Sequence, residues 1–236
     1  MNNNDYVYIV TGSSSGLGKS LITELEKLNL KTIGIDKVNA DTTNLQIDLN
    51  NVSIDDLTQI RDKIGESTIK SIIHCAAVQK NPKKDFENIN KLFDEVFTVN
   101  VKSIYLLATL LEESFKNDSS VCIISSVHSE ATTENNTLYA ASKAAIRGLV
   151  NGLTVSNKDK FSTFEIILGA MDSPMLLNSI SEDELPKLES QLPSKKILNT
   201  SEITKLIVDL VNKHSSILHG STIKIDNGVL SRLFTN

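Results

Sequence analysis

The stretch YIVTGSSSGLGKS, residues 8–20, places a short apolar run before a glycine-rich turn and a segment with helical character. Three of the chain's ten glycines, Gly12, Gly16 and Gly18, lie in it. The amides of such a turn and the N-terminus of the next helix point at one place and can bind an anion, best a pyrophosphate. Gly12 would permit a sharp turn at the end of the strand, and Gly16 would let the ligand lie close to the backbone. Gly18 would allow close packing of the helix on the strand. Glycines also serve ordinary tight turns, so other positions must support this prediction.

Asp36 gives that support. The second apolar run ends in TIGID, which places Asp36 twenty residues after Gly16. A carboxylate there can accept both ribose hydroxyls of an adenosine, and it repels the extra phosphate of NADP. Lys37 follows directly but does not remove the carboxylate. We therefore expect NAD as the preferred cofactor, rather than a solvated strand-end residue with no role.

Short runs rich in valine and isoleucine alternate with longer segments of helical period, which predicts a parallel sheet buried on both faces. With right-handed crossovers this is a Rossmann-like, doubly wound α/β fold, expected as a single domain over residues 1–236. The expected strands are Val7–Val10, Thr32–Ile35, Leu45–Ile47, Ser71–His74, Val121–Ser125, Phe164–Leu168 and Thr222–Ile225. The expected helices are Leu17–Leu28, Ile54–Ile64, Asn88–Phe97, Val101–Phe115, Leu138–Val155 and Glu202–Lys213. Residues 171–199 are expected to form either a substrate-covering lid or only a long connection.

Composition narrows the class of protein. The net charge of −5 and the pI near 5.4 argue against nucleic acid or an anionic membrane as partner. Apolar runs long enough to span a membrane and the regions of a signal peptide are both missing, so we expect a cytoplasmic location. Cys75 and Cys122 lie in strand-like runs and are expected to be free thiols. Metal-ligand spacing is not found, and no metal is expected.

The segment TGSSSGLG resembles the Thr-Gly-x-x-x-Gly-x-Gly signature of the short-chain dehydrogenase/reductase family, classical type. The resemblance implies an NAD(P)-dependent oxidoreductase with a tetrad of Asn, Ser, Tyr and Lys. It extends from Val7 to Lys143, and the closing HGSTIKIDNG also resembles the last strand of the family.

The segment LYAASKAA, residues 138–145, supplies the expected Tyr139 and Lys143. Four positions apart on a helix, the two share one face. A tyrosine with a pKa of about 10 is a poor base, but a nearby lysine ammonium stabilises its phenolate. Taken alone, such a pair is more often packing plus a solvated charge. The resemblance implies that Tyr139 is the acid/base and that Lys143 also binds the nicotinamide ribose.

Two other tetrad positions are present. Ser125 and Ser126 end a predicted strand, and the family's spacing of thirteen residues before the tyrosine selects Ser126, with Ser125 as the fallback. Ser126 would hold the substrate oxygen near Tyr139. Asn100, in FTVNVKS, resembles the asparagine that holds a proton-relay water, and it also suits a helix N-cap.

The remaining site residues follow from the resemblance. Besides the three glycines, Asp36, Tyr139 and Lys143, the expected cofactor contacts are Ser14, Ser15, Leu17, Asp48, Leu49, Cys75, Ala76, Ala77, Gly169 and Ser173. The expected substrate contacts are Ser126, His128 and Met175, although a solvated loop position is the more common role for such a histidine. The chain departs from the family where Ala77 replaces a glycine, Leu168 a proline and Ser129 a glycine.

The leading prediction is an NAD(P)-dependent oxidoreductase that interconverts a secondary alcohol and a carbonyl on a small molecule. The alternative is a non-catalytic NAD-sensing protein, against which the intact Ser126, Tyr139 and Lys143 argue. A sugar-nucleotide epimerase or dehydratase would need a larger domain after Gly169. A homodimer or homotetramer is expected through helices 101–115 and 138–155, the second with a stripe of Ala141, Ala145, Leu149 and Leu153.

Overall fold

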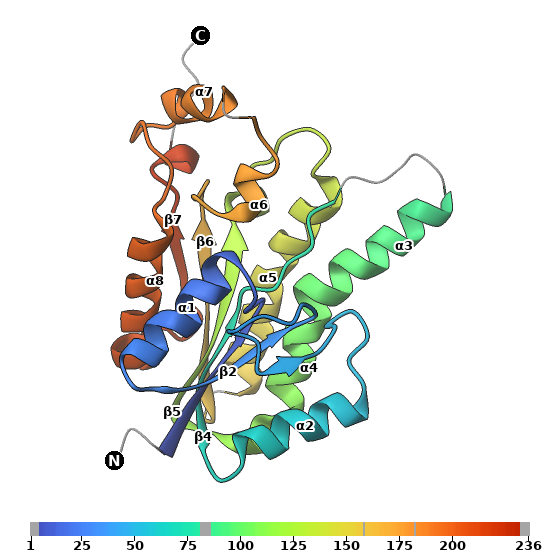
Figure 1. The fold of residues 1–236 in the computed structure, drawn as a ribbon, viewed down its shortest axis with the longest axis vertical. Coiled ribbons are helices and arrows are strands. Elements are labelled where there is room, and N and C mark those ends of the chain that lie inside the picture. Colours follow the sequence, from blue (N-terminus) through green and yellow to red (C-terminus); the bar gives the residue numbers. More distant parts are fainter. Residues whose placement is uncertain (1–4, 81–85, 158, 182, 232–236) are drawn as a thin grey trace.

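The computed structural model describes residues 5–80, 86–157, 159–181 and 183–231. Its centre is a seven-stranded parallel sheet with helices on both faces (Figure 1). The strands are β1 (Tyr6–Thr11), β2 (Lys31–Asp36), β3 (Leu45–Gln46), β4 (Thr68–His74), β5 (Phe115–Ser126), β6 (Phe161–Leu168) and β7 (Thr222–Ile225). Their order across the sheet is β3-β2-β1-β4-β5-β6-β7, with all neighbours parallel. The predicted fold class, a Rossmann-like single α/β domain, is confirmed.

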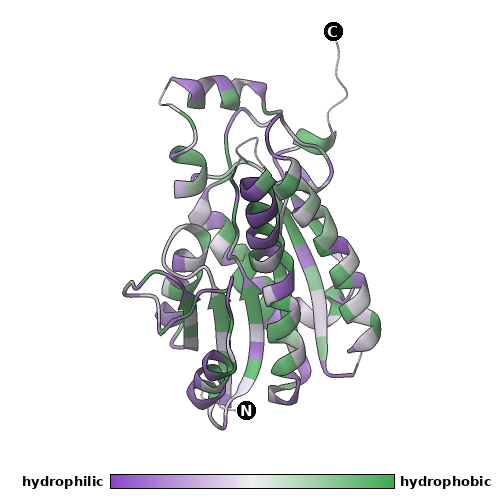
Figure 2. Ribbon diagram, turned by 90° about the vertical axis from the view of Figure 1, so that its right-hand side faces the viewer, coloured by the Kyte–Doolittle hydropathy of each residue, from purple (hydrophilic) through white to green (hydrophobic). Residues whose placement is uncertain are grey.

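The helices form two layers. They are α1 (Gly16–Lys27), α2 (Ile54–Ile64), α3 (Phe86–Phe97), α4 (Ser103–Leu110), α5 (Thr137–Ser156), α6 (Pro174–Leu177), α7 (Glu184–Gln191) and α8 (Thr200–Asp209). Buried side chains of α2, α4 and α5 pack on one face of the sheet, and those of α1 and α8 pack on the other. In Figure 2 the strands carry long green stretches, as expected for a sheet buried on both faces, while green and purple residues alternate along the helices.

The helix expected over Val101–Phe115 is wrong at both ends. A π-helical turn, Thr98–Lys102, connects α3 to α4, and α4 ends at Leu110. Phe115 begins β5, where its ring is buried against Phe161 with 4.4 Å between the ring centroids. The apolar period of residues 106–115 is compatible with a helix, but packing at the base of the sheet decides the conformation of Phe115. The last expected helix, Glu202–Lys213, is also interrupted, because α8 ends at Asp209 and a π-helical turn follows.

Residues 171–199 contain α6 and α7. Both helices lie beyond the carboxyl ends of β5 and β6, at the top of Figure 1. In an open parallel sheet, ligands bind at this edge. The segment is therefore in the right place to cover a bound molecule. Among the described residues, no helix is both long and apolar enough to cross a membrane.

Candidate active site

A pocket of about 1160 Å³ opens at the carboxyl edge of the sheet. The glycine turn after β1, the ends of β2, β4, β5 and β6, and the first turns of α5 line it, and α6 and α7 cover it. Each residue predicted to contact cofactor or substrate borders this pocket. Three members of the predicted tetrad also border the pocket. The fourth, Asn100, does not border it and is fully buried. Positions from Gly12 to Met175 thus come together at one place.

The glycine turn has the geometry that an anion site needs. Gly12 has a φ of +72°, and a Cβ there would lie 2.8 Å from the backbone nitrogen of Ala76. At Gly18 a Cβ would lie 2.1 Å from the carbonyl oxygen of Gly12, so only glycine lets α1 start this close to the turn. Ser15, the N-cap of α1, makes no side-chain capping bond. The first amides of α1 therefore remain available to a pyrophosphate, and the residues fit a dinucleotide.

Asp36 is held at the end of β2 by the backbone. Its two carboxylate oxygens accept hydrogen bonds from the amides of Ser14, at 3.0 Å, and Val38, at 2.9 Å. Because both bonds come from backbone, the carboxylate is fixed beside the glycine turn, where it borders the pocket. Further along the chain, Asp48 is exposed and accepts a bond from the Asn50 amide, and Leu49 is buried beneath it.

The pocket floor after β4 is formed by Cys75, Ala76 and Ala77. The Ala76 amide donates to Thr11 Oγ1 at 3.2 Å, which ties this floor to β1. Cys75 and Cys122 are free thiols, as expected. Burial raises the pKa of Cys75 to about 12, so this thiol is neutral. An uncharged floor of small side chains results, even though Ala77 carries a methyl group where the family has glycine.

The expected catalytic groups converge on α5. Tyr139 and Lys143 are buried on the face of α5 that meets the sheet, and the Lys143 Nζ lies 5.7 Å from the centroid of the Tyr139 ring. The same ammonium donates to the carbonyl oxygen of Ile124 at 2.8 Å. Ser126, at the end of β5, borders the same pocket as Tyr139 and acts to lower the pKa of its phenol. Ser125 instead donates to the Lys143 carbonyl oxygen at 3.4 Å, which favours Ser126 for the substrate.

Burial shifts the pKa values of this group in opposite directions. It raises the pKa of Tyr139 to about 12, although Ser126 acts to lower it, so the side chain is a phenol at neutral pH. It lowers the pKa of Lys143 to about 8, opposed by the nearby Glu165. A phenol in such a site can donate its proton to a developing alkoxide, and an ammonium beside it can stabilise the phenolate that remains.

Asn100 lies in the π-helical turn and does not cap a helix, since the N-cap of α4 is Lys102. Its side chain accepts from the Val78 amide at 2.7 Å and donates to the Val78 carbonyl oxygen at 3.1 Å. It also donates to Ser142 Oγ on α5 at 2.9 Å. Asn100 therefore joins the floor of the pocket to the helix that carries Tyr139.

The segment after β6 approaches the glycine turn. A Cβ on Gly16 would lie 3.5 Å from Cδ of Pro174, the first residue of α6. Gly169 packs closely on Asp226, and Ser173 and Met175 border the pocket. Leu168, which replaces the family's proline, is buried at the end of β6. The sheet thus fixes the start of this segment without a proline.

His128 borders the pocket beside Tyr139, with 5.6 Å between their ring centroids. Its Nδ1 is 2.8 Å from Thr132 Oγ1, and burial lowers its pKa, so the imidazole is neutral at pH 7. Sequence reasoning missed several apolar lining residues from the segment of α6 and α7 and its connections, and from the end of the described chain: Leu176, Ile180, Leu188, Leu192, Val229 and Leu230. No motif marks them, because only the folding of these segments over the sheet brings them to the pocket.

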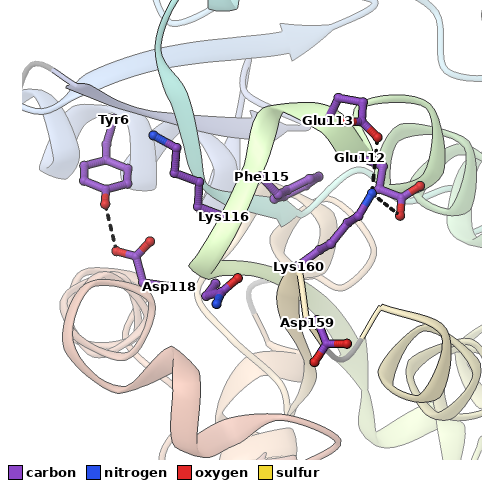
Figure 3. Close-up of a pocket in the computed structure, with 9 residues that line it drawn as sticks. Tyr6, Glu112, Glu113, Phe115, Lys116, Asp118, Asp159 and Lys160 are labelled. Atoms are coloured by element: carbon purple, nitrogen blue, oxygen red, sulfur yellow. Dashed lines mark hydrogen bonds and ion pairs between the residues drawn. The ribbon is translucent and has the colours of Figure 1, made fainter.

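A second hollow, of about 620 Å³, lies around the amino-terminal end of β5 (Figure 3). Three of its charged groups form ion pairs: Lys160 lies 2.8 Å from Glu112 and 3.2 Å from Glu113. The Tyr6 hydroxyl donates to Asp118 at 3.0 Å. None of the predicted site residues is here, so the pocket at the carboxyl edge is the candidate active site.

Comparison with known proteins finds relatives that match over most of the chain. Residues 35–230 match a family model described as enoyl-(acyl carrier protein) reductase. The chain is 25% identical to L-xylulose reductase of Caenorhabditis elegans, over 93% of this chain and 94% of that protein. It is 23% identical to the 3-oxoacyl-[acyl-carrier-protein] reductase FabG of Buchnera aphidicola, over 94% and 96%.

The fold agrees as well. A short-chain dehydrogenase family protein of Francisella tularensis superposes with a TM-score of 0.82 at 25% identity, covering 96% of this chain and 99% of that one. These comparisons give no support to the non-catalytic alternative. Together with the match over residues 35–230, they show that the chain belongs to the short-chain dehydrogenase/reductase family and is an NAD(P)-dependent oxidoreductase acting between alcohols and carbonyl compounds.

Proposed function

We propose that Tyr139 is the proton donor and acceptor of this oxidoreductase and that Ser126 and Lys143 hold the reacting groups around it. The observation that supports this most is the convergence of a buried phenol, a buried ammonium and a strand-end hydroxyl at one end of the dinucleotide-sized pocket. When bound, NAD(P) supplies or takes up the hydride. In carbonyl reduction, the Tyr139 phenol gives its proton to the substrate oxygen, which Ser126 orients by a hydrogen bond.

Asn100 and Lys143 complete the tetrad in this proposal. Lys143 stabilises the phenolate that Tyr139 becomes, and it also binds the nicotinamide ribose. Asn100 braces the pocket floor against α5 through Val78 and Ser142. The glycine turn with Ser14, Ser15 and Leu17, the Asp48–Leu49 corner, the floor at Cys75–Ala77, and Gly169 with Ser173 hold the dinucleotide.

For the substrate, we propose a small uncharged carbonyl compound with an aliphatic part. The wall from α6 and α7 is aliphatic, and Met175, Leu176 and Leu188 belong to it. Among the residues that line the pocket, Lys37 and Lys143 are the basic ones, and both lie in the cofactor region. A coenzyme A or carrier-protein thioester carries phosphates that this wall does not attract. Residues 171–199 act as the substrate-covering part of a single domain that extends over residues 1–236.

A screen of ketones and secondary alcohols against NAD(H), read at the absorbance band of the reduced cofactor, tests this proposal. We expect turnover with uncharged aliphatic ketones and little with acetoacetyl-CoA, which serves as the thioester arm. Turnover with the thioester alone would overturn the substrate class. Absence of turnover with every carbonyl compound would overturn the assignment of roles.

NAD is proposed as the preferred cofactor because Asp36 is fixed beside the glycine turn. NADH is expected to bind at least tenfold more tightly than NADPH, since repulsion between carboxylate and phosphate costs about 1.4 kcal/mol or more. Fluorescence titration measures both affinities. Asp36→Ala should narrow the gap, while Asp41→Ala, an exposed acid that does not border the pocket, should leave it unchanged. Equal affinities in the unaltered protein would contradict the proposal.

We also propose a homodimer or homotetramer, formed through α3, α4 and α5. Large apolar side chains are exposed on these helices: Phe93 is 45% exposed, Tyr105 49% and Val155 78%. The expected stripe on α5 needs correction, because Leu149 is half-buried and Leu153 is buried in the core. The exposed side of α5 instead carries Ala144, Gly148 and Gly152. Small residues there let a second helix approach closely.

Light scattering at micromolar concentration should give a mass of two or four chains of 25.9 kDa. Gly148→Glu places a charge on this face without a clash inside the chain, since nothing lies within 4 Å of a Cβ there. This variant should shift the mass towards the monomer. A monomeric parent protein would rule out the assembly. The free thiols Cys75 and Cys122 support a reducing, cytoplasmic location.

A further inference from the structure

Glu165 is a buried acid in the middle of β6. Its residue is 1% exposed, and it is the one acidic residue buried within the described part of the chain. It does not border the active-site pocket or the second hollow. Burying a carboxylate is costly unless charges or hydrogen bonds compensate it, so an acid at this position calls for a role.

The compensation that the structure provides is partial. Glu165 Oε1 accepts from Thr222 Oγ1 at 2.8 Å and lies 3.8 Å from Nη1 of Arg147. Arg147 Nη1 itself donates to Thr222 Oγ1 at 2.6 Å and to the Gly220 carbonyl oxygen at 3.1 Å. Within the described residues, Oε2 of Glu165 is buried without a hydrogen-bond partner. One of the two carboxyl oxygens of Glu165 is therefore left without a direct partner among these residues.

Glu165 lies beneath α5, the helix that carries Tyr139 and Lys143. The contact with Arg147 shows that Glu165 faces α5, and Lys143 is one turn before Arg147 on the same face. Lys143 Nζ donates to the Ile124 carbonyl oxygen, and Ile124 pairs in register with Ile166, the residue after Glu165. Lys143 and Glu165 therefore both lie in the layer between α5 and strands β5 and β6.

The other titratable groups around this wall do not offer a second anion. From β4, Cys75 is a neutral thiol, and His74 is a neutral imidazole whose pKa burial and the Lys143 charge lower to about 3. Tyr139, on α5 itself, is a phenol at neutral pH. From β7, the Lys224 ammonium pairs with Glu130 at 2.6 Å in an exposed position, and His219, before β7, hydrogen-bonds the Thr163 amide.

We propose that Glu165 is a positioning residue for the proposed reaction, a buried counter-charge that keeps the Lys143 side chain in its ammonium form beside Tyr139. The inference rests on the proposed roles of Tyr139 and Lys143. Alcohol oxidation needs the phenolate–ammonium pair, which differs from the phenol–amine pair only by one proton moved from Tyr139 to Lys143. An anion near Lys143 favours the first pair, because opposite charges attract.

Glu165→Gln tests the charge while keeping the shape and the acceptor for Thr222. The titration of Lys143 is read by NMR on protein with ¹³C-labelled lysine side chains, and its signal is assigned by its loss in Lys143→Met. Without the anion the ammonium is less favoured, so the midpoint should fall by about one unit from its value near 8. The kcat for alcohol oxidation near pH 8 should fall by about tenfold, with KM for the alcohol little changed.

Two variants separate charge from structure. Glu165→Asp keeps the charge and should restore both readouts to nearly the native values. Thr163→Val lies on the same strand and face and removes a buried hydroxyl that has no hydrogen-bond partner in the described chain, so it should move neither readout. If Glu165→Gln does not fold, Glu165→Met buries no unpaired amide and should give the same shift.

An unchanged Lys143 midpoint in Glu165→Gln, or an equal shift in Thr163→Val, would overturn the inference. The NMR titration needs no substrate, so it decides the role of Glu165 even if no alcohol is turned over. Conversely, if the midpoint stays fixed while Tyr139→Phe abolishes turnover, the proposed function stands and the inference about Glu165 fails.

Discussion

Replacing Tyr139 with phenylalanine is expected to lower turnover by roughly a hundredfold or more, the usual contribution of a positioned proton donor. The substitution removes only the phenolic oxygen, and the ring still packs in its buried place on α5. NADH affinity should change little, because the glycine turn and Asp36 are untouched. Steady-state kinetics on any ketone found in the screen, together with fluorescence titration of NADH, measure the two quantities.

Tyr105 provides the matched control for this experiment. It lies on α4, is 49% exposed and does not border the pocket, so Tyr105→Phe should keep full turnover. If turnover of Tyr139→Phe stays within a few-fold of the native value, Tyr139 is a packing residue and another group moves the proton.

Lys143→Met is expected to lower both turnover and NADH affinity, the latter by about tenfold, the equivalent of one lost hydrogen bond from a charged group. The reason is the double role proposed for Lys143, which stabilises the phenolate and binds the nicotinamide ribose. The contrast with Tyr139→Phe is the informative result. If Tyr139→Phe weakens NADH binding as much as Lys143→Met does, the division of roles along α5 is wrong.

The same variant should stabilise the fold. Burial lowers the pKa of Lys143 to about 8 from an ordinary value of 10.5, so the folded chain disfavours the ammonium. The penalty is fully present below pH 8 and fades as the pH rises towards 10.5. At pH 7, Lys143→Met should therefore raise the free energy of unfolding by roughly 1–3 kcal/mol. Thermal unfolding at pH 7 and pH 10 checks this, and a gain that did not shrink at pH 10 would contradict the explanation.

Local sequence signals are sufficient for the glycine turn and for the pair on α5. Gly12 and Gly18 stand where any Cβ would collide with backbone, and Tyr139 and Lys143 need only helical spacing to share a face. By contrast, the end of α4 depends on Phe115 packing against Phe161, which is 46 positions further along the chain. The helical period of residues 106–115 carries no information about that contact, so the expected helix ran too far.

The parts of the site that escaped prediction depend on partners from distant segments. Glu165 is the one charged residue in the sequence of β6, and its surroundings become clear only when Arg147 and Thr222 are placed beside it. Leu153 fits a surface stripe by its spacing, but in the fold it lies in the core cluster that contains Val150 and Phe161. Asn100 could be matched to the family by position, whereas its bonds to Val78 and Ser142 could not.

The π-helical turn at Thr98–Lys102 also limits how the length of this chain can vary in evolution. Its hydrogen bond, from the Ser103 amide to the Thr98 carbonyl oxygen, spans one residue more than an α-helical bond. A deletion of one residue here would leave a continuous helix but rotate α4 against α3 by about 100°. Val96 and Leu107 could then no longer both face inward. Insertions and deletions are therefore excluded from this turn, whereas the loops over the pocket can change length without disturbing the core.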